Sequence, residues 1–178
     1  MEPAAEPKVE VELLAAGEPA AYAALYARLA RRLLRVAGVM LGDAADAEDA
    51  VHDLFVALAR GRERLRYVDD LDAYVFASLR HAIAARTDRQ RLERRYWKSV
   101  VPTVAVESPS PQPAHDQGEL AAALAALPAE QREIVVMKID GGLTFAQIAQ
   151  MLAISPNTAA SRYRYAIEKL RKLLEDRS

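Results

Sequence analysis

The chain has 178 residues and a formal net charge of −1, and it contains no cysteine, which excludes disulfides and thiolate metal sites. Its N-terminus is acidic, unlike a signal peptide, and no apolar run approaches the ~18 residues that span a bilayer. We therefore expect a cytoplasmic protein without membrane insertion. Alanine and leucine supply most of the apolar content and glycine is scarce, which favours an all-α fold.

The charge is distributed unevenly along the chain. Basic residues predominate over residues 80–98 and again from residue 157 onward, whereas acidic residues gather in 1–20 and 43–53. A nearly neutral chain with this arrangement predicts two contacts with a polyanion and a separate surface for a basic partner.

Four prolines interrupt the middle of the chain. Because proline is not tolerated in helix interiors, residues 99–117 are predicted to be a flexible linker. This linker divides the chain into an acidic N-terminal segment (1–17), a first small helical domain (18–98) and a second one (118–178).

Hydrophobic periodicity predicts the helices of both domains. In the first domain we expect helices over 20–41, over a segment that follows an N-cap at Asp43, and over 72–95, with a polar turn at 61–70. In the second domain the expected helices cover 120–127, 130–139, 144–152 and 156–174.

The last two helices have the pattern of a helix-turn-helix. Thr144 and Ser155 are suited to cap them, Pro156 stands at a first helical position, and Ala149 is small enough for two crossing helices to approach. The alternative is a helical hairpin that serves only packing. The polar residues expected on the outer face, such as Asn157 and Arg164, favour DNA binding in the major groove.

Two blocks of sequence resemble the extracytoplasmic-function (group 4) sigma factors of RNA polymerase. Residues 127–133 (LPAEQRE), 142–145 (GLTF), 154–158 (ISPNT) and 161–162 (SR) are similar to region 4 of that family. Residues 46–55 (DAEDAVHDLF) resemble region 2.2, and 72–76 (DAYVF) with 80–84 (RHAIA) resemble regions 2.3 and 2.4. The similarity covers about residues 18–97 and 119–174.

The resemblance implies a transcription initiation factor that binds core RNA polymerase and promoter DNA, and that is controlled by an anti-sigma factor. It implies three sets of site residues. Core polymerase would contact Asp46, Glu48, Asp49, Val51, Asp53 and Leu54. The minus-10 element would contact Tyr74, Arg80, His81, Arg86 and Arg89. The minus-35 element would contact Lys138, Asn157, Thr158, Ser161, Arg162, Arg164 and Tyr165.

The sequence departs from the family pattern at four of the aligned positions, His81, Ala85, Ala159 and Ala160, where we expect altered promoter preference. Two alternatives to a sigma factor are a dimeric stand-alone helix-turn-helix regulator and a sigma-like mimic that sequesters a regulator. The acidic residues of the helix that follows Asp43 could also form merely a solvated face. No nucleophile motif, phosphate-binding loop or metal-ligand spacing is present, so we expect neither catalysis nor a metal or other cofactor.

Overall fold

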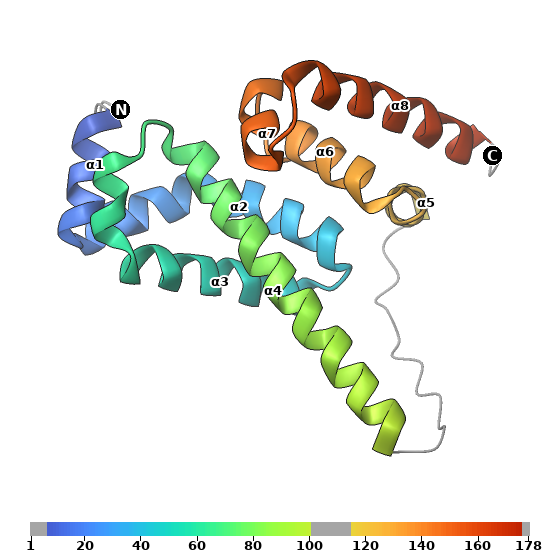
Figure 1. The fold of residues 1–178 in the computed structure, drawn as a ribbon, viewed down its shortest axis with the longest axis horizontal. Coiled ribbons are helices and arrows are strands. Elements are labelled where there is room, and N and C mark those ends of the chain that lie inside the picture. The colour runs from blue at the N-terminus through green and yellow to red at the C-terminus, as the bar shows by residue number, and fades with distance from the viewer. Residues whose placement is uncertain (1–6, 101–114, 176–178) are drawn as a thin grey trace.

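The computed structural model describes residues 7–100 and 115–175, and within these ranges it consists of helices and connecting turns without strands. The all-α prediction is confirmed. Figure 1 shows two groups of helices in contact. The elements are α1 (Pro7–Ala16), α2 (Pro19–Leu41), α3 (Ala44–Arg60), the 3-10 helix η1 (Arg62–Tyr67), α4 (Leu71–Val100), α5 (His115–Ala125), α6 (Ala129–Ile139), α7 (Phe145–Leu152) and α8 (Pro156–Glu175).

Helices α2 and α3 form the centre of the first group. Leu25, Leu29 and Leu33, spaced one turn apart on α2, are completely buried, as the periodicity predicted. Gly42 ends α2 in the left-handed conformation, with a φ of 76° that glycine adopts without strain. The predicted cap is confirmed, since the carboxylate of Asp43 accepts a hydrogen bond of 2.9 Å from the backbone N–H of Asp46.

The segment before α2 and the turn after α3 are more ordered than the sequence indicated. Residues 7–16, within the segment set apart for its acidity, form α1, and η1 lies inside the expected polar turn. The two elements pack on each other, and Leu14 and Leu65 are buried. A few apolar residues among many charged ones are enough to anchor each short helix, which composition alone does not reveal.

Helix α4 has a buried half and an exposed half. Val75, Phe76, Leu79 and Ile83 pack into the core, whereas the segment beyond residue 90 stands away from the other helices (Figure 1). α4 continues to Val100 and α5 begins at His115, so helix extends into both ends of the predicted linker. The remainder of that linker lies outside the described residues.

The second group has a small core of its own and packs against the first. α5, α6 and α8 meet around Leu124, Val135 and Leu170. On its other side α6 contacts α2, and one continuous apolar cluster joins Phe76 and Leu79 of the first group to Met137 of the second. None of the helices described here is long and apolar enough to cross a membrane.

Candidate nucleic-acid interface

Both N-caps of the helix-turn-helix are formed as predicted. Thr144 Oγ1 accepts a hydrogen bond from the backbone N–H of Gln147, and Gln147 Oε1 accepts one from the backbone N–H of Thr144. These two reciprocal bonds form a full capping box at the start of α7. Ser155 Oγ accepts from the backbone N–H of Thr158 at 3.0 Å. Ala153 makes the turn in the left-handed conformation (φ 53°), and buried Ala149 and Ala159 let α7 and α8 approach closely.

One face of α8 is open to a partner. Asn157, Ser161 and Arg164 follow one another at helical spacing, and of these only Ser161 is partly buried. Tyr165 is 58% exposed, and the guanidinium of Arg164 lies 5.8 Å from the centre of its ring. A capped helix end with a hydrogen-bonding amide, a hydroxyl and a planar cation is suited to reading base edges in the major groove.

Other residues predicted for the minus-35 contact have partners within the chain. Thr158 Oγ1 lies 2.8 Å from Ser155 Oγ and belongs to the cap. Arg162 forms an ion pair of 2.9 Å with Glu130. Lys138 donates to the carbonyl of Leu143 at 3.0 Å and lies over the ring of Phe145. These residues hold the domain together in this structure.

The residues predicted for the minus-10 contact all lie on α4 but differ in their surroundings. His81 and Arg89 are exposed beside a hollow of about 320 Å³ between α3 and α4. Tyr74 lines another cavity, described below. Arg80 Nε donates to Glu133 on α6 at 2.7 Å.

Arg86, the remaining residue predicted for the minus-10 contact, is held by carboxylates of α3. Its Nε lies 2.8 Å from Asp46 Oδ1 and its Nη2 lies 2.5 Å from Asp49 Oδ2, while Asp53 is 3.9 Å away. The hydrogen bond to Asp46 is the main cause that raises the pKa of Arg86 above its ordinary value, against partial burial, which lowers it. In this conformation Arg86 serves an α3–α4 contact rather than an open DNA-binding surface.

The predicted polymerase-binding residues of α3 divide in the same way. Val51 and Leu54 are 2% and 1% exposed, so they pack in the core of this structure, and their predicted contact with polymerase stays a prediction. The apolar periodicity located the helix face that is buried but did not reveal that α2 and α4 cover it. Asp46, Asp49 and Asp53 surround Arg86, and Glu48 projects on another side of the helix.

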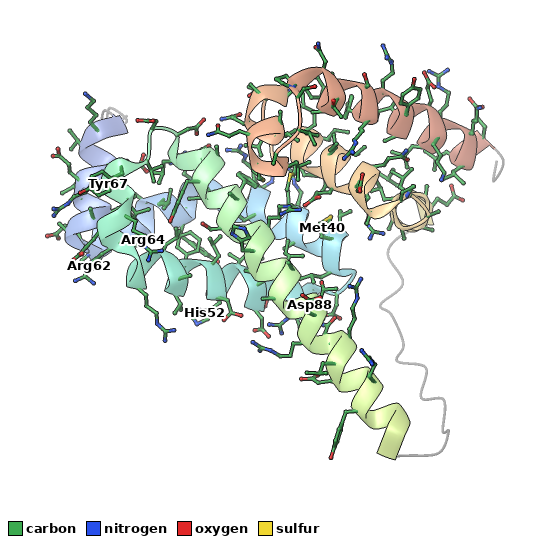
Figure 2. All side chains as sticks on the ribbon, in the orientation of Figure 1. Met40, His52, Arg62, Arg64, Tyr67 and Asp88 are labelled. Carbon is green, nitrogen blue, oxygen red and sulfur yellow. The ribbon has the colours of Figure 1, made fainter. Side chains whose placement is uncertain are left out.

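A shallow groove between α2 and α3 joins two of the predicted polymerase-binding residues, Glu48 and Val51, to residues that the prediction did not include. Its walls include Glu48 and exposed His52, which lies on the outer side of α3 in Figure 2. The rings of Tyr26, 48% exposed, and Phe55 meet edge to face at 5.2 Å beside them. Tyr26 directly follows a core leucine on α2, and this position at the edge of the buried stripe is the sequence feature that could have predicted its place in the groove.

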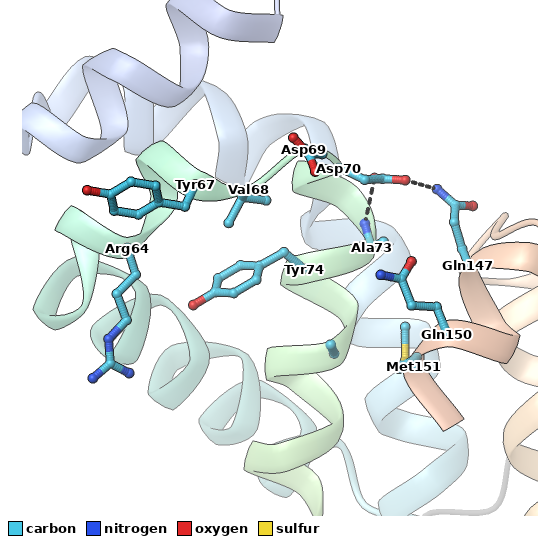
Figure 3. A pocket seen from close by; sticks show the side chains of 11 residues that line it. Arg64, Tyr67, Val68, Asp69, Asp70, Ala73, Tyr74, Gln147, Gln150 and Met151 are labelled. Atoms are coloured by element: carbon cyan, nitrogen blue, oxygen red, sulfur yellow. Dashed lines mark hydrogen bonds between the residues drawn. The ribbon is translucent and has the colours of Figure 1, made fainter. Parts of the chain in front are cut away.

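A cavity of about 620 Å³ separates the start of α4 from α7 (Figure 3). Tyr67 and Tyr74 stand on the first group's side, and Gln150 and Met151 on the other. Asp70 closes one side by accepting hydrogen bonds from the backbone of Ala73 and from the side chain of Gln147.

Comparison with known proteins agrees with this arrangement. Residues 25–93 match the Sigma-70 region 2 family and residues 117–170 match Sigma-70 region 4. The chain is similar to the ECF RNA polymerase sigma factor SigM of Mycobacterium tuberculosis, with 33% identity over 93% of this chain and 84% of that protein. It is 32% identical to SigL of the same species over 91% of this chain and 93% of SigL.

Two solved structures share the fold. The sigma factor RpoE of Bartonella quintana, in complex with the anti-sigma factor NepR, matches 85% of this chain and 97% of its own, with a TM-score of 0.67 and 22% identity. CnrH, in complex with the cytosolic domain of CnrY, matches 96% of this chain and 98% of its own, with a TM-score of 0.69 and 23% identity.

The region 2 and region 4 matches and the full-length relatives place the chain in a defined class, the sigma factors. It belongs to the extracytoplasmic-function family of RNA polymerase sigma factors, which are transcription initiation factors that direct the polymerase to promoters.

Proposed function

We propose that this sigma factor reads the minus-35 promoter element with the exposed face of α8. The observation that carries the proposal is the capped, open helix end on which Asn157, Ser161 and Arg164 line up. Arg164 can bind a guanine edge with two hydrogen bonds, and Asn157 can do the same with adenine. Arg162 and Lys138 would support these contacts from the edge of the domain, near phosphates, once they leave their present partners.

The minus-10 element would be held by α4. Arg89 can follow phosphates, and Tyr74 and His81 offer planar rings on which unstacked bases of an opened strand can lie. Arg80 is part of this set only when it is released from Glu133. Because alanine at position 85 offers no hydrogen bond, base selection would depend more on His81 than it would with a polar neighbour.

Core polymerase would dock on the α2–α3 groove. Glu48 supplies an exposed carboxylate for a basic partner, and the Tyr26–Phe55 pair supplies an aromatic centre that a partner can desolvate. The carboxylates of Asp46, Asp49 and Asp53 would contribute charge from the neighbouring side of α3 while they keep Arg86 in place.

The chain would act in the cytoplasm, where it meets polymerase, by binding alone and without chemistry of its own. An anti-sigma factor is the regulator expected from the two structural neighbours, each of which is described with a protein partner. The two DNA contacts need not be strong singly, because docking on one polymerase raises the effective concentration of each domain at its promoter element.

Run-off transcription with purified core polymerase and a pool of candidate promoters tests this function. Addition of the chain should produce new promoter-dependent transcripts that core enzyme alone does not make. Tight duplex binding without polymerase, together with no transcripts, would instead identify a stand-alone regulator. Binding of neither DNA nor core polymerase would indicate a sigma-like mimic.

A further inference from the structure

The two helix groups are joined by a contact between a basic side chain of α4 and an acidic one of α6. Arg80 Nε lies 2.7 Å from Glu133 Oε1. The side chain of Glu133 is only 14% exposed, whereas that of Arg80 is 39% exposed. The carboxylate is therefore largely removed from water and is paired with this guanidinium.

Two further contacts across the same boundary, between residues that the structure describes, also run from a cation of the first group to an acceptor of the second. Arg32 donates to the carbonyl of Gly141, and Arg35 lies 3.3 Å from a carboxylate oxygen of Asp140. The first group supplies the cations and the second group supplies the acceptors. The bond from Gln147 to Asp70, at the far end of the boundary, runs in the opposite direction.

A carboxylate that binds an arginine in this way uses the same chemistry as a DNA phosphate. Both present anionic oxygens to guanidinium N–H groups in short, charge-assisted hydrogen bonds. We propose that in the free chain Glu133 occupies the place of a DNA strand phosphate at Arg80. The second group of helices then covers part of the α4 surface that is proposed to bind the minus-10 strand. This inference rests on the proposed role of Arg80 in strand binding.

The reach of the molecule leads to the same conclusion. Elements named minus-10 and minus-35 lie roughly 25 base pairs apart, which is about 85 Å of duplex. The longest element, α4, has 30 residues and is therefore about 45 Å long. Because no single element reaches across this distance, we take promoter binding to require the boundary to open and Glu133 to leave Arg80.

Domain separation can be measured by fluorescence energy transfer in the full chain. Because the sequence has no cysteine, Glu63→Cys and Glu168→Cys place dyes on two exposed sites, one in each domain. Glu133→Gln should lower the closed-to-open ratio by about tenfold, as expected for the loss of a hydrogen bond to a charged group. Glu130→Gln, on the same helix but paired with Arg162, should leave the ratio unchanged.

The charge-swapped variant Arg80→Glu/Glu133→Arg should restore the closed state, which a merely structural effect of substitution would not do. A ratio that is the same in the Glu133→Gln and Glu130→Gln variants would overturn the proposal.

Competition with DNA is measured on the same proteins with a labelled 20-nucleotide single strand of mixed sequence. Glu133→Gln should bind it about tenfold more tightly, and adding Arg80→Gln should remove the gain. Equal affinity despite an opened boundary would overturn the competition. Run-off transcription is a separate readout: if it is unaffected by Arg80→Gln, the strand-binding role of Arg80 fails, while the energy-transfer result still decides whether Glu133 closes the domains.

Discussion

Arg86 on α4 and Asp46 on α3 are joined by a hydrogen bond of 2.8 Å. Asp46 also accepts from Gln90 at 2.6 Å, so two residues of α4 hold one carboxylate of α3. A cation assigned from sequence to promoter DNA is thus held by a carboxylate assigned to polymerase. The helix that would dock on polymerase and the helix that would hold the DNA strand are therefore fixed to each other by these hydrogen bonds.

Replacing Arg86 tests this structural role. Arg86→Gln should lower the free energy of unfolding by about 1–3 kcal/mol, because charge-assisted hydrogen bonds from a largely buried guanidinium are lost. Urea titration followed by circular dichroism measures the change. Arg89→Gln, on an exposed site of the same helix, should change it by less than about 0.5 kcal/mol. Unchanged stability of Arg86→Gln combined with loss of promoter binding would make Arg86 primarily a DNA contact.

The core position of Leu54 gives a second prediction. Leu54→Ala should cost about 2–5 kcal/mol of stability, because it leaves a cavity between packed helices. Thermal melts of the variant should show the loss in the absence of any partner. A variant as stable as the parent but deficient in polymerase binding would return Leu54 to the partner surface.

The α2–α3 groove makes a third prediction, about polymerase affinity. Glu48→Lys and Phe55→Ala should each weaken binding to core polymerase by about tenfold or more, since one reverses a charge and the other removes an aromatic anchor. Fluorescence anisotropy with labelled protein measures the affinity. Glu12→Lys, an equal charge change at an exposed site of α1, is the matched control, and similar losses in all three variants would mean a nonspecific effect.

The exposed face of α8 makes a fourth prediction, about promoter selection. Arg164→Ala should reduce discrimination between promoters by about 1–3 kcal/mol, the value of one good contact to a base, and leave binding to core polymerase intact. Competitive transcription on the promoter pool measures the discrimination. Arg162→Ala, which removes the neighbouring arginine that is paired with Glu130, should affect it less. If Arg162→Ala reduced promoter discrimination more than Arg164→Ala, the base contact would lie on the other side of α8.

The sequence predicted the parts of the structure that depend on nearby residues. Asp43, Thr144 and Ser155 act as caps because a cap needs only the residues two or three positions further along the chain. The buried face of α2 was predicted for the same reason, because the spacing of its apolar residues is a local property of the sequence. The helix-turn-helix, with its exposed face on α8, was recognised from its own twenty residues.

The contacts that were missed join residues far apart in the sequence. Arg86 and Asp46 are 40 residues apart, and Arg80 and Glu133 are 53 apart. Each pairing depends on how two helices cross, which their separate periodicities do not specify. For the same reason the α3 pattern did not distinguish Val51, which lines the groove but is almost completely buried, from Phe55, which is partly exposed beside it.

DNA cleavage from single attached iron chelates tests most directly whether α4 and α8 hold two separate promoter elements. Asp88→Cys on α4 and Glu168→Cys on α8 give exposed attachment sites in an otherwise cysteine-free chain, and Glu12→Cys on α1 is the control. In the complex of polymerase, sigma factor and promoter, the α4 chelate should cut near the minus-10 element and the α8 chelate near the minus-35 element. Cleavage by both chelates within one element, or the same pattern from the control, would show that the two helices do not hold separate elements.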